Sequence, residues 1–398
     1  MASLEVADVF RQFGPSYLDA FGDRLLPSHR RAIEDILACR TAAMGVHAYR
    51  CDDCDKTFYV YHGCRNRSCP ACHTHQTQQW LDARTVELLP CPYYHVTVTV
   101  PAQLRDALRS NQSDGYRLLM KAAADAVITL CRDPRYMGAT PAILAVLHTW
   151  TAAMDYHPHV HLLVSGGGIG KDGGGTPCVP LKRTSGSHAS WREAQHPFLV
   201  PVRALSRLVR GKFHDALNKA RPDLEAHLPA SVWTREWVAW CKPWGQGQTA
   251  VLDYLARYVH RIAITNRRIL AMDERTVTFR YKDRKQGLWR TDTLTGHEFM
   301  RRFLQHVLPK GFHKIRYYGL WHPAQRPQRE NARRALLLKQ AQPALEVRNA
   351  NSPSVEAASD DAPGVTCPYC GSHHTKLLGP LPPGLASHAA RASPADPF

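Results

Sequence analysis

The amino-acid sequence predicts an α+β chain in which a helical segment and a cysteine-rich module come before a sheet flanked by helices. Residues 93–100 (YYHVTVTV) alternate and are rich in β-branched and aromatic side chains, which is typical of a strand. Residues 142–150 and 160–165 show two more strand patterns with a short connection between them. Apolar residues recur at helical spacing across 102–132 and 205–220, which predicts helices beside these strands.

Length and composition limit the class of protein. The chain has 398 residues, which suggests two or three domains at about 150 residues each. Its hydrophobic fraction of 44% is enough for a sizeable core and excludes a wholly disordered chain. No run of about 18 apolar residues occurs, and the first residues lack the apolar region of a secretory signal. We therefore expect a cytoplasmic protein with no membrane partner.

The remaining elements follow from the same patterns. Residues 1–50 are expected to be helical, and residues 74–89 are expected to form a helix that ends at Pro90. Residues 166–175 (GGGIGKDGGG) are expected to form a flexible loop, because the run lacks the GxxxxGK[ST] order of a phosphate-binding loop. Further expected elements are helices at 249–262 and 296–307 and strands at 276–281 and 314–318.

The C-terminal part has a different composition. Beyond Leu338 the chain is rich in Ala, Pro, Ser and Asp, which predicts disorder because such a segment cannot bury a core. Cys367-x2-Cys370, followed by His373 and His374, could form a small metal-binding knuckle. One CxxC pair alone is weak evidence for a site.

The stronger metal signal is a group of five cysteines within 22 residues. Cys51-x2-Cys54 and Cys69-x2-Cys72 are two CxxC pairs, and each pair can present two thiolates to one ion. We predict a structural Zn²⁺ site at Cys51, Cys54, Cys69 and Cys72, with Cys64 as a further candidate ligand. A binuclear site and a set of buried free thiols are the alternatives.

A second candidate metal site is the run His157-Pro-His-Val-His161. On a strand, alternate side chains share a face, so His159 and His161 would project together. Two imidazoles on one rigid face can hold a divalent ion and leave positions for a third ligand and for substrate oxygens. The candidates for that third ligand are His157, His148 on the preceding strand, or a residue of the helix expected at 249–262. The alternative is a set of structural histidines.

Residues 249–262 (TAVLDYLARYVHRI) carry two tyrosines on one face of the expected helix. Tyr254 and Tyr258 are four residues apart, next to an apolar stripe at helical spacing. Arg257 and Arg261 each follow one of the tyrosines by three residues and suit phosphate binding. The alternative is that the tyrosines only widen the core-facing side of the helix.

Charge points to a polyanionic partner. The formal net charge is +17, and the segment 257–340 holds twenty Lys and Arg against six Asp and Glu. Such an excess favours nucleic acid, because neutralised phosphates release counterions. Aromatic residues interleave with basic ones after residue 311, as in proteins that hold single strands by base stacking. Candidate DNA-binding residues are Arg257, Arg261, Arg267, Arg268, Lys314 and Arg316.

These features together resemble a known family. His159-Val160-His161 with Tyr254-x3-Tyr258 is similar to the two-tyrosine HUH (His-hydrophobic-His) nucleases, and specifically to rolling-circle transposases of the bacterial insertion sequence 91 group. The HxH signature alone is only moderately specific, whereas the ordered set of blocks is highly specific. The other resembling blocks include ACRTAAMG (38–45), CRNRSCPACH (64–73), LLPCPYYHVTVTVP (88–101), LHTW (147–150), DYHPHVHLLVSGGG (155–168), YLARYVHRIAITNRRI (254–269) and RRFLQHVLPKGFHKIRYYG (301–319).

The resemblance implies a fold and an activity. It implies an HUH endonuclease domain, an antiparallel sheet flanked by helices, that cleaves single-stranded DNA at transposon ends and joins it to target DNA. In that family the two histidines hold Mg²⁺ or Mn²⁺, and the tyrosines become linked to a 5′ phosphate. The resemblance also implies that the N-terminal domain binds zinc and that the reaction needs no nucleotide cofactor. It implies a cytoplasmic protein associated with the nucleoid.

The expected domain organisation follows from the elements and the resemblance together. The segments are 1–90 as the helical and zinc-binding domain, 91–320 as the HUH catalytic domain, 321–345 as a basic helical segment and 346–398 as a disordered tail. Two other functions stay open: a rolling-circle replication initiator or relaxase with the same chemistry, and a non-enzymatic, zinc-dependent nucleic-acid-binding regulator. A zinc hydrolase without a covalent intermediate ranks below both.

Overall fold

The chain folds into two compact units, each made of separate stretches of sequence. The computed structural model describes residues 4–72, 87–171, 178–180, 189–246, 263–283, 286–347 and 365–381, together with Val251, Tyr254 and Tyr258. The cysteine unit comprises Met1–Gln76, Ile264–Val307 and Asn351–Phe398, and the sheet unit comprises Thr77–Ala263 and Leu308–Ala350. These units differ from the continuous segments expected from the sequence.

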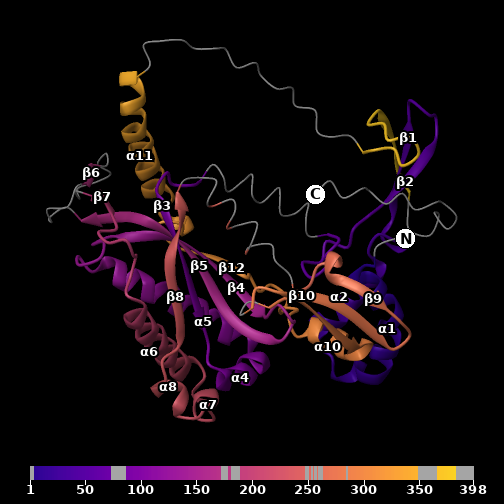
Figure 1. The fold of residues 1–398 in the computed structure, drawn as a ribbon, viewed down its shortest axis with the longest axis horizontal. Coiled ribbons are helices and arrows are strands. Elements are labelled where there is room, and N and C mark those ends of the chain that lie inside the picture. The colour runs from indigo at the N-terminus through magenta and orange to yellow at the C-terminus, as the bar shows by residue number, and fades with distance from the viewer. Residues whose placement is uncertain are drawn as a thin grey trace. The chain divides into compact units, whose positions relative to one another are not determined.

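The sheet unit is built on seven antiparallel strands (Figure 1). They are β3 (Pro92–Thr99), β4 (Thr140–Trp150), β5 (Tyr156–Lys171), β6 (Cys178–Pro180), β7 (Ala189–Glu193), β8 (Val238–Gln246) and β12 (Ile315–Gly319). The main order is β12-β4-β5-β3-β8, and β7 pairs with both β5 and β6. The predicted α+β class with an antiparallel sheet is confirmed.

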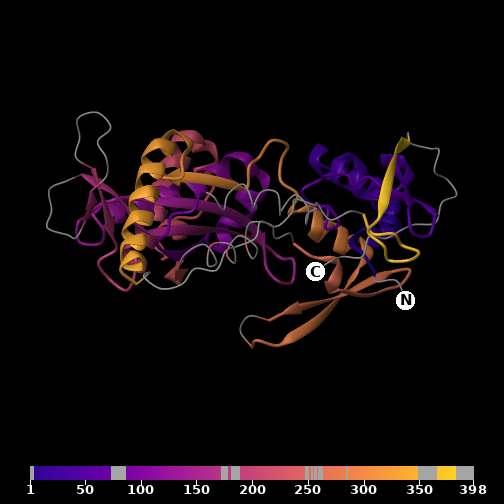
Figure 2. The same ribbon diagram turned by 90° about the horizontal axis from the view of Figure 1, so that it is seen from above.

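Helices cover both faces of this sheet. They are α4 (Arg105–Ser110), α5 (Gln112–Arg132), α6 (Val202–Ala220), α7 (Pro222–Glu225), α8 (Ser231–Thr234) and α11 (Arg326–Val347), with 3₁₀ turns η3 (Ala102–Leu104) and η6 (Pro323–Gln325). Helices α5 and α6 lie on one face, where Val98, Leu162 and Phe213 share a core. Helix α11 lies on the other face (Figure 2). There Leu336 and Leu144 belong to one buried cluster.

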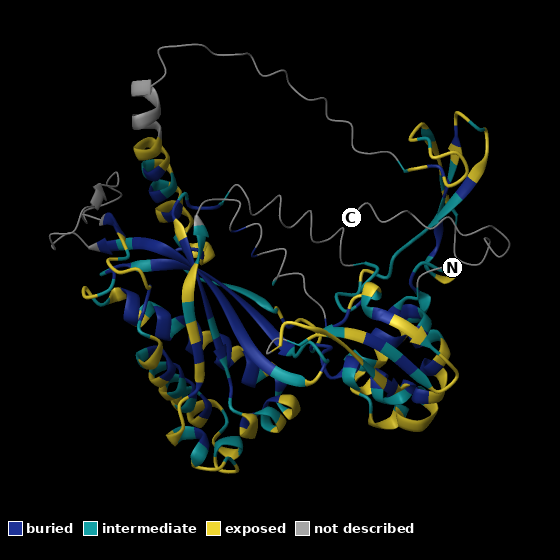
Figure 3. Ribbon diagram, in the orientation of Figure 1, coloured by how far each residue is buried: buried dark blue, intermediate teal, exposed yellow. Residues whose placement is uncertain are grey.

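Strand alternation therefore decides which side chains reach which core. Leu162 and Leu163 are adjacent and fully buried, yet they belong to the cores on opposite faces of the sheet. Burying such a side chain contributes about 1.5–3 kcal/mol. Figure 3 shows the central strands buried along most of their length, while the outer faces of the helices are exposed.

The glycine run after residue 165 continues a strand, so the loop predicted there is wrong for Gly166–Lys171. Strand β7 pairs with this stretch, and Gly167 leaves room for the buried ring of Trp191. A Cβ at Gly167 would lie 2.4 Å from that ring. Glycine is thus required for close packing here, and residues 172–177 lie outside the described residues.

Gly319 ends β12 and provides a test of this sheet. Its φ is +58°, and a Cβ there would lie 1.9 Å from the carbonyl oxygen of Pro141. We expect Gly319→Ala to lower the free energy of unfolding by about 3 kcal/mol, because a backbone clash adds to the left-handed strain. Gly311→Ala is the matched control, since Gly311 has φ +76° and no atom within 4 Å of the added Cβ. In urea denaturation, Gly311→Ala should lower the free energy of unfolding by only about 1 kcal/mol. Equal decreases in the two variants would contradict the proposed clash at Gly319.

The described residues of the cysteine unit form two small antiparallel sheets and three helices. Its elements are α1 (Val6–Phe21), α2 (Pro27–Ala38), β1 (Val46–Cys51), β2 (Thr57–Tyr61), β9 (Ile269–Met272), β10 (Thr276–Lys282), β11 (Trp289–Thr295), α10 (Gly296–Leu304) and β13 (Thr375–Leu381), with 3₁₀ turns η1 (Gly22–Arg24), η2 (Ala42–Met44) and η5 (Asn266–Arg268). The sheet orders are β13-β1-β2 and β11-β10-β9. Phe10 of α1 packs edge-on against Phe303 of α10 at 5.0 Å between ring centroids.

Two predictions about the ends of these units need correction. The helical prediction for 1–50 fails at Val46–Cys51, where apolar and polar residues alternate and β1 pairs with β2. The disorder predicted beyond Leu338 fails up to Val347, because α11 continues that far, and it fails again at Thr375–Leu381, where β13 pairs with β1. The helix predicted at 74–89 lies outside the described residues except for 87–89. Among the described helices none is long and apolar enough to cross a membrane.

Candidate active site and metal centres

Three buried histidines meet on the α11-side face of the seven-stranded sheet. His159 and His161 project from β5, and His148 of the neighbouring β4 lies opposite His159 in the strand register. Each offers a ring nitrogen, and these nitrogens all lie within 4.8 Å of one another. The structure thus brings His148 to the predicted pair. His157 lies outside this group, and its Nδ1 accepts a hydrogen bond from Arg105 at 2.8 Å.

Hydrogen bonds to backbone carbonyls fix the tautomers of two of these rings. His159 Nδ1 donates to the His157 carbonyl at 2.7 Å, and His148 Nε2 donates to the Tyr258 carbonyl at 2.6 Å. A carbonyl oxygen can only accept, so the neutral rings carry their lone pairs on Nε2 of His159 and Nδ1 of His148. Neutral, oriented imidazoles are the form that binds a metal ion. The donor set therefore fits a divalent cation.

His95 of β3 is a site residue that the sequence analysis did not single out. Its Nε2 lies 2.9 Å from His161 Nδ1, and the Thr97 hydroxyl lies 3.2 Å from the same nitrogen. These two side chains hold the orientation of the His161 ring from the adjacent strand. The signal available in the sequence was the alternation His95-Val96-Thr97, which places two polar side chains on one face of a strand.

The structure places both tyrosines beside the histidines. The ring centroid of Tyr258 lies 4.3 Å from that of His161 and 4.9 Å from that of His95. Tyr254 lies 5.3 Å from His95 and 4.9 Å from Tyr258, again between ring centroids. Tyr258 has a π-helical backbone conformation, a feature often found at functional sites.

The two phenols differ in their environments. Tyr254 is fully buried with Val251 in the core beneath α11, and its hydroxyl has no hydrogen-bond partner among the described residues. Burial raises the pKa of the Tyr254 phenol well above 10, and the neighbouring Tyr258 adds to this. The alternative was that the tyrosines only widen the core-facing side of the helix. Tyr254 does pack in the core, as that alternative expects, whereas Tyr258 is partly exposed.

The candidate DNA-binding residues are scattered over the two units. Lys314 and Arg316 belong to the sheet unit and are partly buried. Arg316 lies opposite Ala145, a residue of the α5–α6 core, so it faces away from the histidines. Its guanidinium carbon lies 5.3 Å from the Phe312 ring centroid.

The other four basic candidates do not lie among the described residues of the sheet unit. Arg267 and Arg268 belong to η5 in the cysteine unit, where Arg267 is exposed and Arg268 Nε donates to the Arg280 carbonyl at 2.8 Å. Arg257 and Arg261 lie outside the described residues.

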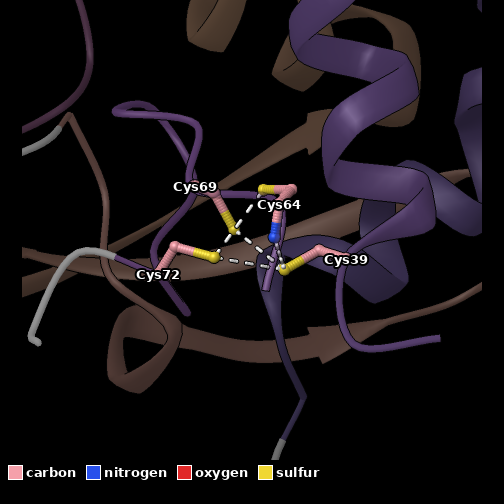
Figure 4. Close-up of side chains that lie close together, drawn as sticks. All are labelled: Cys39, Cys64, Cys69 and Cys72. Carbon is pink, nitrogen blue, oxygen red and sulfur yellow. Dashed lines mark hydrogen bonds between the residues drawn. The ribbon is translucent and has the colours of Figure 1, made fainter. Parts of the chain in front are cut away.

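The cysteines form two clusters, and the predicted grouping of four into one site is corrected. Cys69 and Cys72 meet Cys64 and Cys39, a residue the sequence analysis did not consider (Figure 4). Their Sγ atoms lie 3.4 Å apart for Cys39–Cys72 and 3.7 Å for Cys64–Cys72. A tetrahedral zinc site with Zn–S bonds of about 2.3 Å requires sulfurs about 3.8 Å apart. This cluster therefore fits Zn²⁺.

The second cluster contains the other predicted CxxC pair. Cys51 and Cys54 meet Cys367 and Cys370, with Sγ separations of 3.5 Å for Cys51–Cys370 and 3.7 Å for Cys54–Cys367. The CxxC pairs are alike in sequence, so their spacing alone could not show which pairs share an ion. The alternative of two metal sites in this region agrees better with the geometry than a single site does.

Comparisons with known proteins agree with this architecture. A family model described as "Transposase zinc-binding domain" matches residues 9–100, and one described as "Putative transposase" matches residues 142–329. The chain is 39% identical over 332 residues, 79% of each chain, to "Putative transposase y4qJ" of Sinorhizobium fredii. It is 26% identical over 300 residues, 72% of this chain and 68% of the relative, to "Transposase for insertion sequence element IS801" of Pseudomonas savastanoi pv. phaseolicola. No solved structure matches.

The second model covers the strands that carry His148, His159 and His161 as well as both tyrosines. The first covers six of the eight clustered cysteines. The extent and identity of these matches show that the chain belongs to the insertion sequence 91 family of transposases and carries that family's zinc-binding domain.

Proposed function

We propose that this transposase cleaves and rejoins single-stranded DNA at transposon ends through a covalent phosphotyrosine intermediate, in rolling-circle transposition. The main support for the proposal is one observation. The ring centroids of Tyr258 and His161 lie 4.3 Å apart, and His161 belongs to a buried group of three histidines. A phenol beside a group of metal-binding imidazoles is what nucleophilic attack on a phosphodiester requires.

His148, His159 and His161 would hold the catalytic Mg²⁺ or Mn²⁺. When bound, such an ion makes the phosphorus more electrophilic and stabilises charge on the leaving oxygen. The chain itself orients the three rings. Carbonyl groups orient His148 and His159, while His95 and Thr97 orient His161.

The chemical step is a transesterification. The phenol oxygen forms a bond to phosphorus, the bond from phosphorus to the 3′ oxygen breaks, and the phenol proton is transferred overall to that oxygen. The products are a 5′-phosphotyrosyl strand and a free 3′-OH. The phosphodiester energy is conserved in the phosphotyrosyl bond, so rejoining needs no nucleotide cofactor.

Tyr258 is the better placed of the two tyrosines for the first cleavage. It is the partly exposed phenol and the one whose ring contacts His161 and His148. Tyr254 is fully buried, so its phenol oxygen cannot reach a bound strand until the packing around it changes. A second strand transfer from Tyr254 would therefore follow the first, after the DNA has entered the site.

The test is a covalent adduct. Purified protein is mixed with labelled single-stranded transposon ends and Mn²⁺ or Mg²⁺, and an SDS-resistant protein–DNA band is expected, with none in EDTA. A DNA-binding regulator would give a shifted native complex and no such band. A zinc hydrolase would give cleaved DNA without the band.

The open edge of the histidine face is the proposed track for the DNA strand. Edge strand β8 places Trp240 opposite Thr97 and Lys242 opposite His95, so both side chains share the face of the histidines. The Trp240 side chain is 68% exposed. Two strand spacings, about 10 Å, separate it from His161. An exposed indole and a cation at this distance suit a stacked base and its phosphate.

Two substitutions separate these roles. We expect Trp240→Ala to weaken binding of a single-stranded end by about 5- to 150-fold, because one stacked base contributes about 1–3 kcal/mol, whereas Trp240→Phe keeps most of the affinity. Lys242→Ala should reduce the slope of log Kd against log salt by about 0.7, the value for one phosphate contact on a single strand. Fluorescence anisotropy across a salt series measures both. Unchanged affinity in Trp240→Ala would remove β8 from the track.

A further inference from the structure

We propose that Cys51, Cys54, Cys367 and Cys370 form a second structural Zn²⁺ site, which attaches the C-terminal segment to the N-terminal part of the chain. The zinc-binding family model ends at residue 100, so it contains only two of these four ligands. Cys51 and Cys370 are 319 positions apart in the sequence. The metal-binding domain of this chain would thus be discontinuous and completed from its other end.

The two CxxC loops have the same backbone conformation. In the first loop the Asp55 N–H donates to the Cys51 carbonyl at 2.9 Å, and Asp55 has φ +58°. In the second loop the Gly371 N–H donates to the Cys367 carbonyl at 2.9 Å, and Gly371 has φ +76°.

A second pair of backbone hydrogen bonds is also equivalent in the two CxxC loops. The Cys51 N–H donates to the Lys56 carbonyl at 3.0 Å, and the Cys367 N–H donates to the Ser372 carbonyl at 2.7 Å. Two matching turns that each aim two thiols at a common point are the arrangement of a closed tetrahedral site.

A small antiparallel sheet supports the two loops. Strand β13 pairs with β1 from Val46 opposite Leu381 to Cys51 opposite Thr375, and β2 pairs with the other edge of β1. One backbone bond, from the Asp52 N–H to the His374 carbonyl at 2.9 Å, joins the loops directly. The C-terminal segment is therefore an integral strand of this sheet.

The core around the four cysteines is small. Its buried members are Cys51, Phe58 and Cys367, and two of these three are proposed ligands. The partly buried residues around them are Tyr49, Cys54, Val60 and Val365, and β1 also buries Val46 and Ala48. Leu377 and Leu378 of β13 are more than half exposed. A core of this size contributes little against the entropy of ordering a distant chain segment. Zinc coordination supplies that stability in small domains.

The first test counts metal in the full chain. Inductively coupled plasma mass spectrometry should find one zinc fewer in Cys367→Ser/Cys370→Ser than in the parent protein, and one fewer in Cys39→Ser/Cys64→Ser. Cys241→Ser is the control, because this partly buried thiol of β8 belongs to neither cluster and should leave the zinc content unchanged. Unchanged zinc in Cys367→Ser/Cys370→Ser, or a disulfide among the four cysteines of the native protein, would overturn the proposal.

The second test asks whether the ion is structural. Hydrogen exchange at the amides of β13 should be slow in the parent protein and at least about tenfold faster in Cys367→Ser/Cys370→Ser, while exchange in α1 and α2 stays the same. Cys370→His keeps a competent ligand, so it should retain both the zinc and the slow exchange. A zinc lost without any change in β13 exchange would show an adventitious ion only.

Discussion

Tyr258→Phe is expected to lower the rate of the first cleavage by at least about 1,000-fold and to abolish the covalent adduct. Phenylalanine keeps the ring that packs against His161 and His95, so the site should keep its shape while losing the attacking oxygen. Single-turnover cleavage of a labelled single-stranded end measures the loss. Circular dichroism and metal content should match those of the parent protein.

Tyr254→Phe is the comparison that gives this result its meaning. Its ring is fully buried and its hydroxyl has no hydrogen-bond partner among the described residues, so the substitution should cost little stability. We expect first cleavage within about threefold of the parent rate, with loss of the later strand transfer. A normal adduct in Tyr258→Phe and none in Tyr254→Phe would reverse the proposed order. Normal adducts in the double variant would remove both tyrosines from the mechanism.

His159→Ala/His161→Ala is expected to abolish cleavage in Mg²⁺ or Mn²⁺, a loss of at least about 1,000-fold, while single-stranded DNA still binds. The double substitution removes two of three imidazoles that lie within 4.8 Å of one another, which leaves His148 alone. Calorimetric titration with Mn²⁺ should show the loss of one binding event. Retained cleavage would make the trio structural.

His95→Gln should give a graded effect in the same assays. His95 contacts the His161 ring and is not one of the three residues that would hold the ion, so its loss should weaken metal binding by about 10- to 100-fold. Higher Mn²⁺ concentrations should then restore much of the cleavage. We expect this rescue if His95 positions the His161 ring for metal binding. We expect no rescue if His95 only stabilises the fold.

The sequence predicted the central strands because each has one consistent pattern. In residues 93–100, Tyr94, Val96, Val98 and Val100 face the α5–α6 core, while His95 and Thr97 face the histidine site, and β3 covers Pro92–Thr99. Strand β8 was missed because Pro243 and Gly245 are typical of loops. It is an edge strand, where a proline costs no ladder hydrogen bond on the open side. The glycine half of β5 was missed because the ring that fills its space, Trp191, comes from a later strand.

The site was predictable where its residues are neighbours in sequence. The His159–His161 spacing and the Tyr254–Tyr258 spacing each define a shared face, and the structure brings the two pairs together. His95 depends on strand register, which the sequence does not show. The cysteine clusters depend on contacts over as many as 319 positions, so the correct partners of Cys51 and Cys54 could not be read from their spacing.

The most direct test is to identify the atom that carries the DNA. After reaction of the parent protein with a single-stranded end in Mn²⁺, proteolysis and mass spectrometry should find a nucleotide joined through its 5′ phosphate to a peptide containing Tyr258, and the released strand should end in a 3′-OH. Cleavage products with a free 5′ phosphate and an unmodified Tyr258 peptide would contradict the account, because water would then be the nucleophile.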